Sequence, residues 1–186
     1  MTHPPGHQGH PHAGSGDGRP DREHHHRARY ERPAGWDETL RRVRELSPRT
    51  VILDIEPLLA NWHGGQDALD QGVASVVPQV AAVPGVQVVC LATNSLRHRP
   101  EMPDAEGVQM VWIAGAGKPL RTAPYQEFPR PGVVIGDQVA TDGVLAWRLG
   151  YTFVQYRPQL DRVPAGPWLM DRLGRAIRPL LFTRRP

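Results

Sequence analysis

Side chains suited to phosphate chemistry follow four short apolar runs in this 186-residue chain. The set comprises Asp54 and Glu56 after TVIL, Thr93 and Asn94 after VQVVCLA, Lys118 after VQMVWIA, Asp137 at the end of GVVIGD, and Asp142 just beyond it. Two carboxylates that hold one Mg²⁺, with an ammonium group beside them, would let an anionic nucleophile approach an anionic phosphate. The pattern therefore favours phosphoryl transfer.

The two acids of the first run have distinct expected roles. Asp54 is the candidate nucleophile, which would form an aspartyl phosphate that water then hydrolyses. Glu56 projects to the same side of a strand as Asp54, so we expect it to protonate the leaving alkoxide and then deprotonate water. The expected cofactor is Mg²⁺, which prefers oxygen ligands. Its candidate ligands are Asp54 and Asp137, with Glu56 as a further carboxylate.

Lys118 is the only lysine among 22 lysine and arginine residues. A compact ammonium differs from a planar guanidinium in what it recognises, so a solitary lysine indicates a site that needs a point charge. We expect Lys118 to neutralise charge during catalysis. Thr93 and Asn94, with nearby backbone amides, would hold the phosphate oxygens.

These residues require a sheet whose strands end at one edge. Continuous apolar runs predict buried strands, and helical periodicity between them predicts covering helices. The expected strands are 50–55, 86–93, 108–114, 132–137 and 151–156. The expected helices are 36–46, 67–83, which is interrupted or shifted at Pro78, 140–150 and 167–182. This alternation predicts an α/β fold with a doubly wound, mostly parallel Rossmannoid sheet, in which ligands bind at the carboxyl ends of the strands.

Composition divides the chain into three parts. Residues 1–34 are rich in His, Pro, Gly and Arg, and we expect a disordered tail, whose histidines could bind metals only adventitiously. Residues 35–160 form the α/β domain. Residues 161–186 contain an amphipathic helix and a basic tail, and we expect the helix to dock on the core rather than on a membrane.

The order ILDIEPLL, CLATNS, AGKP and VVIGDQVATDGVLAWRLGY resembles the four motifs of the haloacid dehalogenase (HAD) superfamily, and most closely its class IIIA, YqeG-like phosphatases. The resemblance covers roughly residues 40 to 156. It implies a HAD-like fold with Asp54 as nucleophile, Thr93 as phosphate ligand, Lys118 as charge stabiliser, Asp137 as Mg²⁺ ligand and Asp142 as a supporting acid that orients Lys118 or a metal-bound water.

The first motif departs from the family pattern Asp-x-Asp-x-Thr, because Glu56 and Leu58 occupy its second acidic and its hydroxyl positions. A misplacement of about an ångström at a reacting centre can cost about two orders of magnitude in rate. The alternative hypothesis is therefore a catalytically impaired HAD-like protein that serves as a binding or scaffold module.

Short intervals between the motifs leave no room for a cap domain. Only 38 residues separate Asp54 from Thr93, and 24 separate Thr93 from Lys118. An open crevice cannot enclose a small metabolite, so we expect a capless enzyme acting on a bulky or macromolecular phosphate. Otherwise a protein partner or a second copy of the chain would cover the site.

Several other classes fit the sequence less well. The chain has no apolar stretch long enough to span a membrane, no secretory signal and one cysteine, Cys90, inside an apolar run, which favours the cytoplasm. Its arginines cluster near the ends without interleaved aromatics, which argues against nucleic acid as the partner. GAGKP lacks the spacing of a P-loop or a dinucleotide fingerprint. A receiver domain would carry its metal-binding acids before Asp54, whereas here Asp137 and Asp142 follow Lys118.

Overall fold

Six parallel strands form one sheet in the computed structural model, which describes residues 29–158 and 164–182. The three central strands, β2 (Thr50–Asp54), β3 (Val88–Ala92) and β5 (Gly132–Gly136), are buried at every position. β4 (Gln109–Ile113) and β6 (Thr152–Gln155) flank them, and the short β1 (Tyr30–Glu31) lies at the edge beside β6. The order is β1-β6-β5-β2-β3-β4. The predicted parallel α/β sheet is confirmed.

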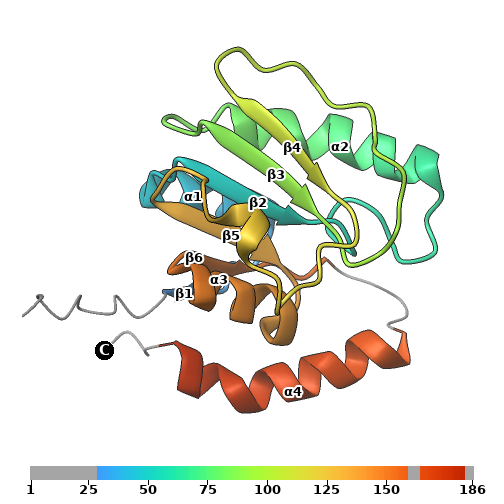
Figure 1. Ribbon diagram of the computed structural model, residues 1–186, viewed down its shortest axis with the longest axis vertical. Coiled ribbons are helices and arrows are strands. Elements are labelled where there is room, and N and C mark those ends of the chain that lie inside the picture. Colours follow the sequence, from blue (N-terminus) through green and yellow to red (C-terminus); the bar gives the residue numbers. More distant parts are fainter. Residues whose placement is uncertain (1–28, 159–163, 183–186) are drawn as a thin grey trace, which may run out of the picture.

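Helices cover both faces of the sheet (Figure 1). Side chains alternate between the faces along a strand, so Val51 and Leu53 pack with α1 (Trp36–Leu46) and α2 (Gln66–Ala81). Ile52 points the other way and joins the core beneath α3 (Val144–Leu149). The fold is doubly wound, as predicted, with a separate apolar core on each face of the sheet.

The winding direction changes beside β2. From β2 the chain proceeds to β3 and then β4 on one side, whereas β5 and β6 lie on the other side. In such sheets a crevice opens at the carboxyl ends of the strands where the winding reverses. Asp54, the last residue of β2, stands at this point.

Two boundaries differ from the sequence-based expectation. The predicted break at Pro78 is wrong, because α2 continues through it to Ala81. Pro78 and the residue one turn earlier, Ala74, are exposed, so the carbonyl that loses its helical partner can bond to water. The predicted tail 1–34 is too long, because β1 (Tyr30–Glu31) pairs with β6 and the Tyr30 hydroxyl donates to Gln155 at 2.5 Å. Residues 1–28 lie outside the described part of the chain.

The predicted C-terminal helix is present as α4 (Ala165–Leu181) and docks on the domain. It packs against the π-helical turn η2 (Val139–Gly143) that precedes α3, and Figure 1 shows it running along the outside of that layer. The helix docks as predicted, but its buried residue is Gly174, whereas Trp168, Leu169 and Leu173 of its apolar stripe stay about half exposed. None of the helices in the described residues combines the length and the apolar content that crossing a bilayer requires.

Candidate active site

The buried ammonium group of Lys118 joins two carboxylates at the carboxyl edge of the sheet. Its Nζ donates to Asp54 Oδ1 at 2.6 Å, to Asp142 Oδ1 at 2.8 Å and to the carbonyl of Ala92 at 3.1 Å. These bonds use all three ammonium donors. Burial alone would lower the pKa of Lys118, but the charges of Asp142 and Asp54 outweigh it and hold the pKa above its usual range. Lys118 is therefore a fixed positive charge.

Asp142 reaches this lysine from the π-helical turn η2. The turn is closed by hydrogen bonds from the amides of Asp142 and Gly143 to the carbonyl of Gln138, at 2.9 and 3.1 Å. A single π-helical turn is a common device at functional sites. Gly136 makes room for the carboxylate, because a Cβ at that position would overlap the Asp142 side chain. The fully buried position of Asp142 thus depends on a glycine at the end of β5.

Three carboxylates meet closely enough to share one cation. Oxygen atoms of Asp54, Asp137 and Asp142 all lie within 4.8 Å of one another. Asp137 Oδ1 is buried without a hydrogen-bond partner in the structure. Counting all three acids as ionised, with Lys118 opposing them, the group carries a net charge of −3 + 1 = −2. Buried charges are normally paired or bind metals, so these residues fit a divalent cation with oxygen ligands.

The pKa values of these acids reflect the same crowding. Burial, and then the charge of Asp142, raises the pKa of Asp137 to about 7. The same two causes raise the pKa of Asp54 well above its usual range, although Lys118 acts in the opposite direction. A bound divalent cation would favour the ionised form of both acids. The ionised cluster therefore needs a further positive charge, which a divalent cation would supply.

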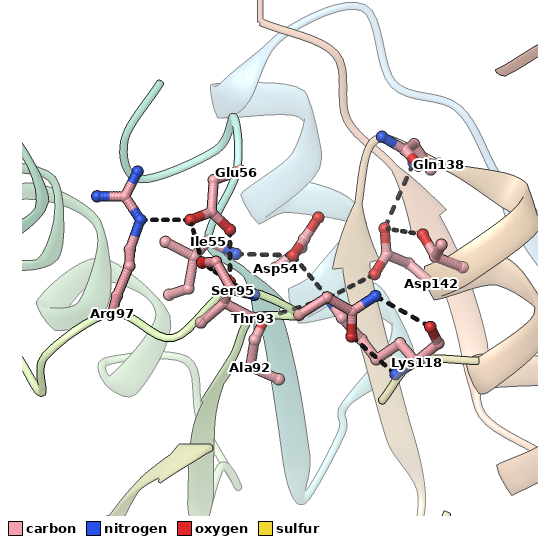
Figure 2. Close-up of polar contacts among 12 residues, drawn as sticks. Asp54, Ile55, Glu56, Ala92, Thr93, Ser95, Arg97, Lys118, Gln138 and Asp142 are labelled. Atoms are coloured by element: carbon pink, nitrogen blue, oxygen red, sulfur yellow. Dashed lines mark hydrogen bonds and ion pairs between the residues drawn. The ribbon is translucent and has the colours of Figure 1, made fainter. Parts of the chain in front are cut away.

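Glu56 lies in a separate polar cluster on the other side of Asp54 (Figure 2). Its carboxylate accepts hydrogen bonds from Thr93 Oγ1 at 2.7 Å and from Ser95 Oγ at 3.0 Å. The Nε of Arg97 also donates to it, while the other two nitrogens of that guanidinium bond to the carbonyls of Gly64 and Asn61. Glu56, expected as a further metal ligand, is not among the three clustered carboxylates of the described residues.

The two residues expected to hold phosphate have other partners in this structure. The hydroxyl of Thr93 is fully buried and bonds to Glu56 and Ser95. The side-chain amide of Asn94 donates to the carbonyl of Lys118 at 2.9 Å and accepts from its backbone N–H at 2.8 Å. Asn94 therefore fixes the loop that carries Lys118.

A cavity of about 1020 Å³ opens above these groups. Asp54, Glu56, Asn94 and Lys118 line it, so four of the residues expected from the sequence share one cavity. Asp137 instead lines a neighbouring cavity of about 290 Å³. Sequence reasoning missed Arg97, which lies two residues after Ser95 in the motif segment, and the wall that α4 contributes. Because α4 lies beyond the motifs in the sequence, no pattern in the sequence indicated that this helix would line the cavity.

No insertion covers the site within the two motif intervals, where α2, β3 and β4 are the regular elements between Asp54 and Lys118. The predicted absence of a cap domain is thus confirmed. The chain was compared with protein-family models, with curated proteins and with solved structures, and none of the three comparisons gave a match.

Proposed function

We propose that this chain is a Mg²⁺-dependent phosphomonoester hydrolase of HAD type that acts through a phosphorylated Asp54. The single observation that carries the proposal is the ammonium of Lys118 bridging Asp54 and Asp142 within a cluster of three carboxylates. A structural ion pair would need one acid for one lysine. The excess of two negative charges is instead what a site built for a divalent cation requires.

Asp54 would supply the attacking oxygen. Its Oδ1 already accepts from Lys118 and, at 2.9 Å, from the amide of Ile55, which leaves Oδ2 for attack on phosphorus. The bond between phosphorus and the leaving oxygen then breaks, and the phosphoryl group stays on Asp54. Mg²⁺ held by Asp54, Asp137 and Asp142 would reduce the repulsion between this carboxylate and the phosphate. Lys118 contributes a second positive charge at the same place.

Glu56 would act as the general acid and then as the general base. As a protonated acid it gives its proton to the departing alkoxide, and as a carboxylate it takes one from the water that attacks the phosphoryl group on Asp54. That attack breaks the bond between phosphorus and Asp54 and releases inorganic phosphate. Ser95 and Arg97, which bond to Glu56, fix its carboxylate at the wall of the cavity.

Hydrolysis of p-nitrophenyl phosphate with Mg²⁺ tests the proposal. Asp54→Asn should lower kcat about a thousandfold or more, and chelation of Mg²⁺ should abolish turnover. Asp67→Asn is the matched control, because Asp67 is an exposed acid in the first turn of α2. Beryllofluoride should bind the intact chain and not Asp54→Asn. The proposal fails if the intact chain neither turns over the ester nor binds Mg²⁺.

The second candidate function is a binding or scaffold protein with the same fold. The observation that favours it is that three donors, including the charged Arg97, occupy the Glu56 carboxylate, because a general acid or base must instead face the proton that it transfers. Binding of Mg²⁺ and beryllofluoride without turnover of any phosphomonoester would support this candidate.

A further inference from the structure

The C-terminal helix α4 forms one wall of the active-site cavity. Gly174 lets the helix approach η2, since a Cβ there would lie 2.9 Å from the Cβ of Val139 and 3.1 Å from the amide of Ala140. Asp171 adds an ion pair to Arg157, just beyond β6. The contact at Gly174 holds α4 against the segment that carries Asp142, and the ion pair holds it against the segment after β6. The cavity is therefore walled by the chain itself, although no cap domain is inserted between the motifs.

The cavity has a charged floor and apolar walls. Asp54 and Lys118 lie at the floor, where the phosphate would bind. The apolar side chains that line the walls are Trp62, Leu96, Leu120, Leu169, Met170 and Leu173. Leu96 and Leu120 are 89% and 80% exposed, and Leu169 and Leu173 of α4 are about half exposed. Apolar side chains gathered around one opening indicate a binding surface.

We infer that these walls bind the leaving group of the substrate, and that this group is the hydrocarbon part of a water-soluble alcohol phosphate. The inference rests on the proposed function. The leaving oxygen lies roughly in line with the attacking oxygen, on the far side of phosphorus, so the rest of the substrate must extend from Asp54 into the cavity. A volume of about 1020 Å³ exceeds what a phosphate group fills and suits a ligand of small-molecule size.

Most of the cavity lining is apolar, and the polar side chains of Asn94, Ser95 and Arg97 within it already bond to other groups of the chain. The guanidinium of Arg97 is already bonded through all three nitrogens, to Glu56, Gly64 and Asn61. A polar leaving group would lose hydrogen bonds to water without regaining them on leucine and tryptophan side chains. A hydrocarbon group instead gains from leaving water. The expectation of a bulky, macromolecular phosphate rested on an open crevice, and α4 adds to that crevice an apolar wall on which a smaller hydrocarbon group can bind.

A series of n-alkyl phosphates isolates this effect, because ethyl, butyl and hexyl phosphate differ in hydrocarbon length while their leaving alkoxides are chemically alike. Complete burial of a methylene is worth about fourfold in affinity. We expect kcat/KM with Mg²⁺ to rise at least about tenfold from ethyl to hexyl phosphate. Equal values across the series would overturn the inference and leave the proposed hydrolase intact.

Substitutions on α4 test whether this helix causes the preference for longer alkyl chains. Leu173→Gln should reduce the hexyl-to-ethyl ratio of kcat/KM at least about threefold, because Leu173 lines the cavity. Leu180→Gln is the matched control, since Leu180 lies on the same helix, is 83% exposed and lies outside the cavity lining. The same loss in both variants, or in neither, would overturn the assignment of this wall.

Binding measured by calorimetry keeps the inference testable if the chain hydrolyses nothing. Hexylphosphonate, which cannot be hydrolysed, should bind at least about tenfold more tightly than ethylphosphonate in the presence of Mg²⁺, and equal dissociation constants would overturn the inference. Sedimentation with phosphatidylcholine vesicles containing phosphatidic acid tests a membrane source of the same chemistry. Vesicle binding that is lost in Leu180→Gln and kept in Leu173→Gln would show that the outer face of α4 binds a bilayer. That result would overturn the inference of a water-soluble substrate.

Discussion

Asp137→Asn should stabilise the metal-free protein while weakening its hold on Mg²⁺. Asp137 Oδ1 is buried without a hydrogen-bond partner, and Asp54 and Asp142 lie within 4.8 Å of the same carboxylate. Ionising Asp137 in that place opposes two neighbouring charges. An amide of the same shape removes the charge, and its N–H groups can donate hydrogen bonds to the neighbouring carboxylates.

The size of the effect follows from the pKa of Asp137, which rises from 3.8 to about 7 through burial and then the charge of Asp142. One pKa unit corresponds to about 1.4 kcal/mol, so ionised Asp137 costs up to about 4 kcal/mol of unfolding free energy above pH 7. Structural relaxation and water entry reduce this cost. We therefore expect the unfolding free energy of Asp137→Asn to exceed that of the intact chain by about 1–3 kcal/mol at pH 8 in EDTA. This corresponds to about 2–4 °C in Tm for each kcal/mol.

The pH dependence has a definite sign. Below pH 4 the carboxyl is protonated in both the folded and the unfolded chain, so it costs nothing. As the pH rises from about 4 to about 7, the unfolded chain loses this proton while the folded chain keeps it, and the intact protein loses stability relative to Asp137→Asn. Urea unfolding in EDTA at pH 4, 6 and 8 should show a difference that grows with pH.

Adding Mg²⁺ should then reverse the order. A ligand at a hundred times its dissociation constant stabilises the folded state by about 2.7 kcal/mol, and the intact chain should gain this while Asp137→Asn gains less. The reasoning is refuted if Asp137→Asn is no more stable than the intact chain at pH 8 in EDTA. Equal stabilisation of both chains by Mg²⁺ would refute the assignment of Asp137 as a ligand.

Three further changes test the supports of the site. Lys118→Met leaves two buried carboxylates without their cation, and denaturant unfolding at pH 8 in EDTA should show a loss of about 3–5 kcal/mol. Gly136→Ala forces the Asp142 carboxylate away from its place, and it should cost about 1–3 kcal/mol and weaken Mg²⁺ binding measured by calorimetry. Arg97→Lys keeps the charge but cannot hold Glu56 and both loop carbonyls, so kcat should fall about tenfold or more.

Each of these variants has its own contrary result and control. Gly35→Ala is the control for Gly136→Ala, because a Cβ at Gly35 meets no atom within 4 Å. Full retention of stability by Lys118→Met at pH 8 would show that the two carboxylates do not need that charge. Unchanged Mg²⁺ binding in Gly136→Ala would separate Asp142 from the cation site, and an unchanged kcat in Arg97→Lys would show that Glu56 keeps its place without the guanidinium.

The strands and the edge of the sheet that carries the site could be predicted from the sequence. A strand covered on both faces needs an unbroken apolar run, so TVIL and VVCLA indicated β2 and β3 within one or two residues. Parallel strands end at one edge, which placed Asp54 and Thr93 together before any contact was known. The two short motif intervals likewise predicted that no cap domain is inserted.

The partners of each side chain were decided only by the tertiary structure. Periodicity indicated a helix over 140–150, but its first turn is π-helical, and that single extra residue per turn directs Asp142 toward Lys118. As a carboxylate, Glu56 could bind a metal or transfer protons. The hydrogen bonds from Arg97 and Ser95 determine the direction in which its side chain points. Local patterns cannot encode such contacts, because they depend on groups dozens of residues away.

The position of α4 shows the same limit on a larger scale. Its amphipathic pattern predicted docking through the apolar face, because apolar side chains gain free energy by leaving water, yet Leu169 and Leu173 of that face stay about half exposed. The same pattern suits any apolar surface of similar area. Close approach at Gly174 selects η2 as the partner, and the ion pair of Asp171 with Arg157 fixes α4 to the segment after β6. The sequence alone thus determined that this helix docks, whereas shape complementarity in three dimensions decided that it walls the active site.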